Sequence, residues 1–494
     1  MKFFKNIFSL STPRKTRARI PNQLNLDRPL LYLSNKDPWS IRDAFEGTAI
    51  FGATGAGKTT ASGQILAKAF LRAGFGGLVL TAKPDERRMW IRYCKETGRS
   101  RSLLMFGPEH PFRFNFLEYE LRRPGRGGGM TENILQLLLR ATEVSSAVRQ
   151  NSSDPYWQRS AEQLIRNLVD LCSIAYRRLS LPMFHKVIAS APQTRDEATS
   201  ASWQRQSHCF QTLNRARNNP KTAIQKNDYA ITRHYWLREF PTLSERTRSI
   251  IVSMVTGTID LLLRGPVREL ICTKTNITPE ASRKGAIILL DLPIKEYRDV
   301  GRMVQTLWKY SWQLTMESKA LQSNPRPVFL WADEAQYFIG RDDALFQMTA
   351  RSSRVATVFL SQNIPNYNAS LGGGERARAE TESLLGNLST KIFHSNSDLT
   401  TNRWASELVA RDRQLHMTYG RSQSGGEIGR AQTSLNTSGS DSYEFQIQPI
   451  EFTRLRKGGP PYGFHVDGIV TQSGRVWRAS GTNFLRVTFN QRRA

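Results

Sequence analysis

The chain has 494 residues, of which 39% are hydrophobic, enough to bury the cores of several globular domains. Its 70 Lys and Arg outweigh 42 Asp and Glu, and the net charge of +28 indicates a polyanionic partner, nucleic acid before an acidic membrane surface. Four cysteines exclude a disulfide framework and show no zinc-site spacing, so we expect reduced thiols in the cytoplasm.

The first part of the chain, residues 1–45, is polar, basic and interrupted by proline, and we interpret it as a basic N-terminal lead-in. Its opening, MKFFKNIFSLSTPRKTRARIP, has an apolar patch that is too short to span a bilayer. It is either a segment that lies on a membrane surface or a mobile basic extension. Further along, Asp260 interrupts the run IIVSMVTGTIDLLL, and we expect no transmembrane helix.

Residues 46–118 alternate strand-like runs with helical patterns, as in a βαβ layout. A strand at 47–51 leads into GATGAGKT, which fits the phosphate-binding pattern G-x-x-x-x-G-K-[ST]. A helix is expected from Thr59 to Leu71, and further strands at 76–82 and 102–106. The residues expected to bind nucleotide are Gly52, Ala53, Thr54, Gly55, Ala56, Gly57, Lys58, Thr59 and Thr60.

The glycine-rich loop suits a nucleoside triphosphate. Its glycines let backbone N–H groups converge on phosphate oxygens, and the following helix adds its positive dipole end. Lys58 would place its charge between the β- and γ-phosphates, and Thr59 would offer its hydroxyl to Mg²⁺. A guanine-specific switch is disfavoured, because NKD at Asn35–Asp37 precedes the loop. We therefore expect ATP and Mg²⁺ as the bound cofactors.

Helical patterns dominate residues 119–265, which we interpret as an all-α inserted domain. The region opens with a basic, glycine-rich loop at 122–129. Within it, Trp157, Ala161 and Leu164 recur at the spacing of one helix face.

Strand-like runs return in the last region, residues 266–494, which we assign to the second part of the nucleotide-binding domain. The runs at 285–293, 327–336 and 355–363 are nearly continuous in apolar residues, as is typical of parallel strands covered on both faces. Residues 420–442 are rich in Ser, Gly and Gln and predict a flexible loop.

Two of these runs end in residues suited to ATP hydrolysis. VFLWADEAQ ends in Asp333, which we expect to hold Mg²⁺ with Thr59, and in Glu334, which we expect to polarise the attacking water. Adjacent acids at a strand end favour hydrolysis over a passive switch. VATVFLSQN ends in Gln362, expected at the γ-phosphate or the water. The predicted catalytic residues are thus Lys58, Glu334 and Gln362.

Asp333 follows Lys58 by 275 residues, more than a compact core needs, and the helical segment supplies the extra length. The predicted fold class is α/β: a RecA-like P-loop NTPase core with a mostly parallel twisted sheet, carrying a mostly helical inserted domain.

Beyond the P-loop, the sequence resembles the type IV coupling proteins, the TraG/TraD-like conjugative DNA-transfer ATPases of the FtsK–HerA group. LVLTAKPDE (78–86) is similar to the family's Asp-Pro-Lys-Gly-Glu segment, with Thr81 in place of Asp and Pro84 in place of Gly. RFNFLE (113–118) resembles its Asn-Pro-Leu element, with Phe116 in place of Pro. Further similar stretches lie at 154–165, 243–254 and 386–410, so the resemblance covers roughly residues 45 to 480.

This resemblance implies an ATP-hydrolysing DNA translocase that couples a relaxase–DNA substrate to a type IV secretion channel. It also implies a hexameric ring of identical subunits, with sequence-independent DNA binding in the central channel. The sequence shows no counterpart of the family's transmembrane N-terminal hairpin, so we expect a cytoplasmic protein. Any attachment to the inner face of the plasma membrane would then depend on a partner protein.

In such a ring an arginine of the neighbouring subunit would complete each nucleotide site. The candidates are Arg376, Arg378 and Arg403. Arg351 and Arg354 precede the glutamine strand and are candidates for the site or for DNA contact.

Two alternatives stay open. A soluble HerA-like or FtsK-like translocase for DNA processing or defence would share the same chemistry; a nearby nuclease gene would favour it, and a relaxase or secretion-channel gene would favour the coupling protein. A non-hydrolysing nucleotide switch or DNA-binding scaffold belongs to another class, and Glu334 argues against it.

Overall fold

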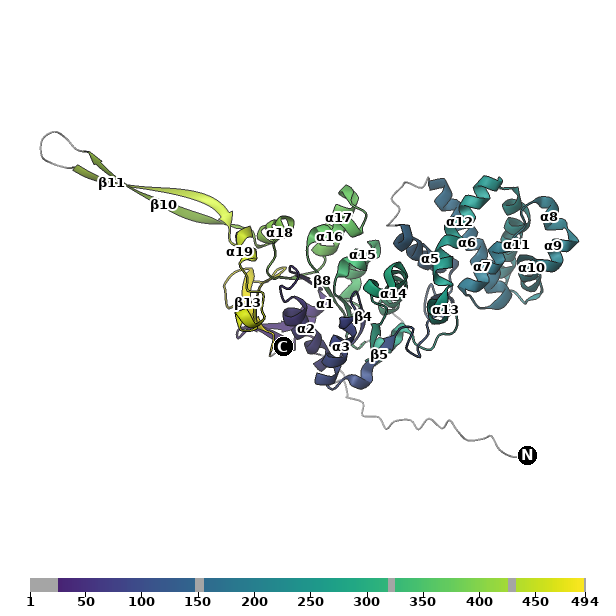
Figure 1. Cartoon of the computed structure of the whole chain (residues 1–494), viewed down its shortest axis with the longest axis horizontal. Coiled ribbons are helices and arrows are strands. Elements are labelled where there is room, and N and C mark those ends of the chain that lie inside the picture. Colours follow the sequence, from purple (N-terminus) through teal and green to yellow (C-terminus); the bar gives the residue numbers. More distant parts are fainter. Residues whose placement is uncertain (1–24, 147–154, 319–324, 425–431, 493–494) are drawn as a thin grey trace, which may run out of the picture.

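The computed structural model of the chain describes residues 25–146, 155–318, 325–424 and 432–492. A nine-stranded sheet forms its centre, with a region of helices on one side and a long β-hairpin on the other (Figure 1). The strands of the sheet are β3 (Thr48–Phe51), β4 (Gly76–Leu80), β5 (Leu103–Phe106), β6 (Ile287–Leu290), β7 (Val328–Ala332), β8 (Val355–Ser361), β9 (Thr390–Phe393), β12 (His465–Gln472) and β13 (Phe484–Asn490).

The strand order is β13-β12-β9-β3-β8-β7-β4-β6-β5. All neighbours from β9 to β5 pair in parallel, whereas β12 runs antiparallel to both β9 and β13. The predicted mostly parallel sheet is thereby confirmed. Because β8 lies between β3 and β7, the strands before the glycine-rich loop, Gln362 and the paired acids are consecutive neighbours, and their carboxyl ends meet at one edge.

Both faces of the sheet are buried, which explains the continuous apolar runs. In β3, Ala49 and Phe51 pack into one core cluster and Ile50 into the other. Helices α2 (Gln64–Arg72) and α3 (Asp85–Glu96) cover the Ile50 face, and α14 (Ile294–Glu317) covers the opposite one. The remaining helices of this part are α15 (Arg341–Ala350), α16 (Ile364–Ser370), α17 (Gly374–Gly386), α18 (Leu399–Val409) and α19 (Pro449–Thr453).

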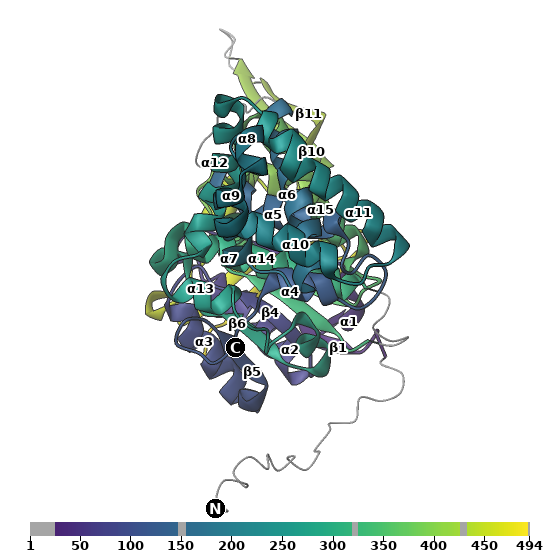
Figure 2. The same cartoon turned by 90° about the vertical axis from the view of Figure 1, so that its right-hand side faces the viewer.

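Between β5 and β6, the described residues form helices and no strand (Figure 2). The helix face predicted from Trp157, Ala161 and Leu164 lies on α6 (Pro155–Tyr176), where Ala161 and Leu164 are buried and Trp157 is half-buried. The exact limits of the inserted domain stay a prediction. The α-helices of this region are α4 (Phe116–Arg122), α5 (Thr131–Ser146), α6 (Pro155–Tyr176), α7 (Leu181–Ala189), α8 (Arg195–Thr199), α9 (Ala201–Gln206), α10 (His208–Asn218), α11 (Ala223–His234), α12 (Glu245–Leu262) and α13 (Gly265–Ile271).

The predicted lead-in at 1–45 is wrong for its second half, while residues 1–24 lie outside the described part. Residues 29–45 pack on the core, with Trp39 only 1% exposed. The Asp37 carboxylate accepts hydrogen bonds from the backbone N–H groups of Arg478 and Ala479 at 2.7 and 3.1 Å. Composition could not reveal this, because the partners lie more than 400 residues away. The elements are β1 (Pro29–Ser34), β2 (Asp37–Ser40) and α1 (Ile41–Phe45).

The predicted flexible loop at 420–442 is also wrong where it is described. Strands β10 (Arg411–Ser424) and β11 (Gln432–Phe445) pair antiparallel and project from the body (Figure 1), while residues 425–431 lie outside the described part. Leu415, Met417 and Tyr419 alternate along β10 and so share one face of the hairpin. All three are more than half exposed.

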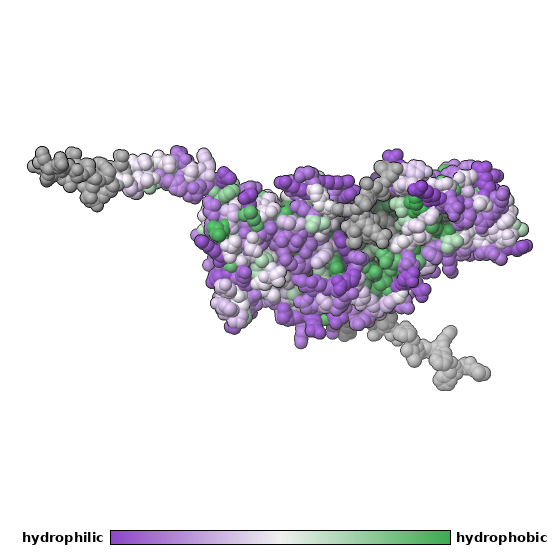
Figure 3. All heavy atoms as spheres, turned by 45° about the horizontal axis from the view of Figure 1, so that its top comes forward, coloured by the Kyte–Doolittle hydropathy of each residue, from purple (hydrophilic) through white to green (hydrophobic). Residues whose placement is uncertain are grey.

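Within the described ranges, no helix by itself meets the length and apolarity needed to cross a bilayer, although the bent pair α12 and α13, at 94°, meets both together. Hydrophilic residues predominate on the face drawn in Figure 3, with separate hydrophobic patches among them.

Candidate nucleotide-binding site

The glycine-rich loop lies at the carboxyl edge of the sheet, between β3 and the short π-helix η1 (Thr59–Gly63) that continues into α2. The backbone N–H of Gly52 donates to Ser361 O at 3.3 Å, and that of Ala53 donates to Ser395 O at 2.9 Å. These bonds fix the loop to the strands on both sides. Gly57 has φ of +82°, and a Cβ there would lie 2.6 Å from Val466 Cγ2. Conformation and space therefore both require glycine at this position.

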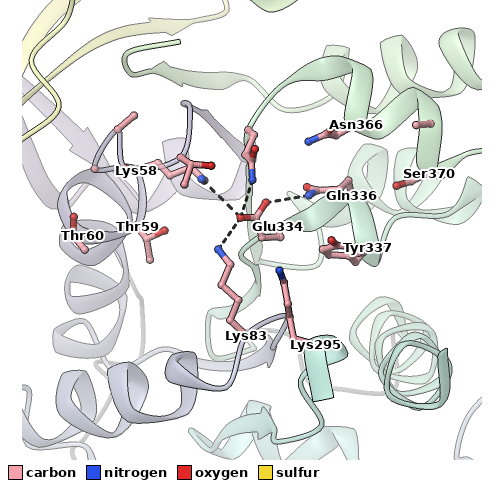
Figure 4. Close-up of a pocket in the computed structure, with 16 residues that line it drawn as sticks. Lys58, Thr59, Thr60, Lys83, Lys295, Glu334, Gln336, Tyr337, Asn366 and Ser370 are labelled. Carbon is pink, nitrogen blue, oxygen red and sulfur yellow. Dashed lines mark hydrogen bonds and ion pairs between the residues drawn. The ribbon is translucent and has the colours of Figure 1, made fainter. Parts of the chain in front are cut away.

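A cavity of about 570 Å³ opens beside this loop, a volume typical of small-ligand sites (Figure 4). Of the predicted nucleotide-binding residues, those at 54–60 line it, whereas Gly52 and Ala53 do not. The remaining lining residues are Lys83, Lys295, Glu334, Gln336, Tyr337, Gln362, Asn366, Ala369 and Ser370.

The two predicted magnesium ligands are in direct contact. The Thr59 hydroxyl donates to Asp333 Oδ2 at 2.6 Å, although 274 positions separate the two residues. Asp333 is 2% exposed, and its Oδ1 accepts the backbone N–H of Glu334 at 2.9 Å. A hydroxyl beside a carboxylate is the oxygen donor set that Mg²⁺ prefers, so these residues fit the ion. Neither His nor Cys takes part in this pair.

Glu334 points into the cavity. Its backbone has φ 54° and ψ 50°, a left-handed conformation that non-glycine residues rarely adopt and that recurs at functional sites. Its Oε1 accepts from Lys83 Nζ at 2.7 Å and lies 3.9 Å from Lys58 Nζ. The predicted general base and the predicted phosphate-binding lysine therefore share one cavity.

Two glutamines complete the surroundings of Glu334. Gln362 donates to its Oε1 at 3.4 Å, so the amide expected from the strand order does lie beside the acid. Gln336 donates to its Oε2 at 3.0 Å and accepts from the Ser361 hydroxyl at 2.9 Å. The carboxylate is thereby anchored to β8 as well as to its own strand.

These contacts set the protonation of the site. Burial raises the pKa of Asp333, while the hydrogen bond from Thr59 opposes the rise. Burial would also raise the pKa of Glu334, but Lys83 and Gln336 lower it to about 2. Burial lowers the pKa of Lys83, and the bond to Glu334 more than offsets this, so that the pKa is raised. Lys83 and Glu334 therefore form a charged pair at neutral pH.

The arginine candidates do not line this cavity. Arg376 and Arg378 lie on α17, where they pair with Glu380 and Glu382 at 3.1 and 2.9 Å, and Arg403 is exposed on α18. An arginine that acts in a neighbouring subunit is not expected at its own site, so the three stay predictions.

Arg351 and Arg354 precede β8 at its amino end, while the cavity lies at the carboxyl end of that strand. Arg351 pairs with Glu46 at 3.4 Å, and Arg354 donates to Pro325 O at 3.3 Å. Neither lines the candidate site of its own chain.

The sequence reasoning missed Lys83 and Lys295. Lys83 stands in LTAKPDE at the lysine of the family's Asp-Pro-Lys-Gly-Glu segment, but that resemblance alone gave the lysine no role at the site. Its position directly after a strand of the parallel sheet was a usable signal, because such residues lie at the carboxyl edge. Lys295 lies in the first turn of α14, and both side chains point into the pocket in Figure 4.

A buried histidine links the phosphate-loop helix to the antiparallel edge of the sheet. His394 Nε2 lies 2.7 Å from the Ser62 hydroxyl, and its Nδ1 lies 2.8 Å from the backbone carbonyl oxygen of Asp467. Since that carbonyl only accepts, Nδ1 carries the proton and Nε2 accepts from Ser62. Burial lowers the pKa of His394 to about 4.

This histidine is expected to make stability depend on pH. Its folded pKa lies below the value of about 6.5 in the unfolded chain, so its contribution is complete above pH 6.5 and is lost as pH falls towards 4, by up to about 3 kcal/mol. Urea unfolding of the wild type and His394→Gln across this range measures the effect. The wild type should lose more stability than the variant; parallel curves would contradict the assignment.

Comparisons with known proteins find the fold but no close relative. No protein-family model and no curated protein matches the chain. Solved structures of the bacterial conjugative coupling protein TrwB do match. Its unbound monoclinic form has a TM-score of 0.59 at 12% identity, over 94% of this chain and 88% of that one.

Two nucleotide complexes of TrwB match in the same way. The complex with ADP and Mg²⁺ has a TM-score of 0.57 at 12% identity, over 94% and 89% of the two chains. The complex with the non-hydrolysable ATP analogue ADPNP has a TM-score of 0.55 at 13% identity, over 92% and 89%. The chain therefore has the fold of a conjugative coupling protein over nearly its whole length, as the resemblance implied.

Proposed function

We propose that this chain is an ATP-hydrolysing DNA translocase that couples a relaxase–DNA substrate to a type IV secretion channel. The observation that carries the proposal is the meeting of Thr59 and Asp333 at 2.6 Å, with Glu334 and Lys58 in the same cavity. A phosphate loop and paired acids, brought together across 274 positions of the chain, are the parts that hydrolysis of a nucleoside triphosphate requires. The fold shared with a coupling protein that has been solved with the analogues ADPNP and GDPNP supports a nucleoside triphosphate as the substrate.

Each residue has a defined task in this site. Lys58 and the loop backbone bind the β- and γ-phosphates, and Thr59 and Asp333 hold Mg²⁺. The bound ion would neutralise phosphate charge. Glu334 orients the attacking water and accepts its proton, and Gln362 positions the water or the γ-phosphate.

The proposal extends to the assembly. Identical subunits form a hexameric ring in the cytoplasm, held by a partner at the inner face of the plasma membrane, and Arg376, Arg378 or Arg403 of one subunit completes the site of the next. The helical region engages the relaxase–DNA substrate. In support, Arg122, Arg178, Lys274 and Lys284 line a cavity of about 670 Å³, where they outnumber Glu118 and Glu280, although Glu118 pairs with both arginines.

DNA binding is expected to depend steeply on salt and not on sequence. The net charge of +28 favours contacts with phosphates, which release counterions when they form. If the protein contacts 6 to 10 phosphates, its affinity for DNA should fall about 10³- to 10⁵-fold when the salt concentration rises from 50 to 200 mM. Fluorescence anisotropy with two unrelated DNA sequences measures both properties. A preference for one sequence that persists at high salt would contradict this mode of binding.

ATP turnover with and without DNA tests the proposed function. We expect Mg²⁺-dependent hydrolysis that rises when DNA is added, because a motor hydrolyses ATP fastest when it is engaged with its track. If no turnover occurs with DNA present, the chain is a nucleotide-binding scaffold and the motor is excluded.

A further inference from the structure

Three side chains donate hydrogen bonds to the carboxylate of Glu334 within its cavity. Its Oε1 accepts from Lys83 at 2.7 Å and from Gln362 at 3.4 Å, and its Oε2 accepts from Gln336 at 3.0 Å. The side chain is 4% exposed. To activate a water molecule, this carboxylate must offer a lone pair to it. These donors occupy three of about four lone-pair sites, so water has one site left, and the departure of a donor would open a second.

Lys83 is the donor best built to leave. Gln336 is 6% exposed, and its amide oxygen is held by the Ser361 hydroxyl. The side chain of Lys83 is 37% exposed, while its backbone is fixed by a bond of 3.0 Å from its N–H to Glu86. A fixed backbone with a long, half-exposed side chain allows the ammonium group to change partners without moving the strand or α3.

A triphosphate supplies the competing partner. Lys83 and Lys58 both lie within 4 Å of the same carboxylate oxygen, and Lys58 is the residue expected between the β- and γ-phosphates. The terminal phosphate would thus arrive beside Lys83 and carry more negative charge than the single carboxylate. A diphosphate ends one group short of this position.

We propose that Lys83 is a positioning residue that senses the third phosphate of ATP. When no triphosphate is bound, Lys83 donates to Glu334. When ATP binds, the ammonium group of Lys83 moves to the γ-phosphate, and Glu334 becomes free to bind the attacking water. The inference rests on the proposed function and adds a regulation to its site. It makes ATP, but not ADP, able to release the base, and it assigns Lys83 a direct contact that distinguishes the two nucleotides.

The test measures the preference for ATP over ADP by titration with fluorescent ADP and a fluorescent, non-hydrolysable ATP analogue. The proteins are the wild type, Lys83→Ala, Lys83→Met, which keeps the aliphatic stem, and Lys83→Ala combined with Glu334→Gln. Lys95→Ala, an exposed lysine on α3, removes the same charge outside the cavity and serves as the control. In Lys83→Ala and Lys83→Met we expect the ratio of ATP-analogue affinity to ADP affinity to fall about tenfold, which is the value of one charge-assisted hydrogen bond. The affinity for ADP should stay unchanged.

The combined variant separates a direct contact from simple charge shielding. If Lys83 binds the phosphate, Glu334→Gln does not restore the preference in the absence of Lys83. If Lys83 only shields Glu334, removing the carboxylate charge restores the preference, and the inference is wrong. It is also wrong if the Lys83 variants keep the wild-type preference. In both cases DNA-stimulated turnover by the wild type would leave the proposed function intact, whereas a wild type that binds neither nucleotide would overturn both.

Discussion

Replacing Lys58 by alanine is expected to lower ATP turnover by about a hundredfold or more, with or without DNA. The lysine is the charge that the loop brings to the β- and γ-phosphates, and removing one donor aimed at the developing charge of a transition state costs about 10²- to 10³-fold. A hundredfold loss corresponds to about 2.7 kcal/mol of transition-state stabilisation. A coupled phosphate-release assay and fluorescent nucleotide titration measure turnover and affinity together.

The fold is expected to survive this change. Glu334 lies 3.9 Å from Lys58 Nζ but keeps its shorter bonds to Lys83 and Gln336. The melting temperature should therefore stay close to that of the wild type, and Lys95→Ala should keep full turnover. A Lys58→Ala protein that folds and hydrolyses ATP at the wild-type rate would show that the loop does not hold the reacting phosphates.

Replacing Glu334 by glutamine is expected to abolish turnover while nucleotide binding is retained. The amide has nearly the same shape but does not accept a proton, and the loss of a general base costs about 10²- to 10⁴-fold. The left-handed backbone at this position, φ 54°, places no greater demand on glutamine than on glutamate. Pre-steady-state hydrolysis measures the chemical step, and analogue titration measures binding.

Loss of binding together with loss of turnover would point to a structural role for Glu334. Near-normal turnover would place the base elsewhere. Only a variant that binds ATP and fails to cleave it agrees with Glu334 as the residue that activates water.

The geometry of the candidate nucleotide site was predictable because each of its main parts is local in sequence. The phosphate loop follows an apolar strand directly, and Asp333 and Glu334 follow another. Parallel strands bring their carboxyl ends to one edge, so apolar runs ending in polar residues identify the site without knowledge of the strand order. The strand order was needed only to show that β8 places Gln362 between the loop and the acids.

The features that sequence reasoning missed depend on distant partners or on competing patterns. Residues 29–45 are ordered by contacts with residues beyond 470, which no local pattern indicates. In the hairpin, a Ser- and Gly-rich composition masked the alternation of Leu415, Met417 and Tyr419 along β10. The role of Lys83 arises from a contact with Glu334 across 251 positions. An arginine that acts on a neighbouring subunit depends on the assembly and cannot be selected from one chain.

The most direct measurement of the central claim is ATP-driven displacement of streptavidin from end-biotinylated DNA. The account predicts displacement by the wild type with ATP and Mg²⁺, and none with a non-hydrolysable analogue, with Lys58→Ala or with Glu334→Gln. A wild type that hydrolyses ATP on DNA but displaces no streptavidin, or that displaces it equally without ATP, would contradict the claim that this chain is a DNA motor.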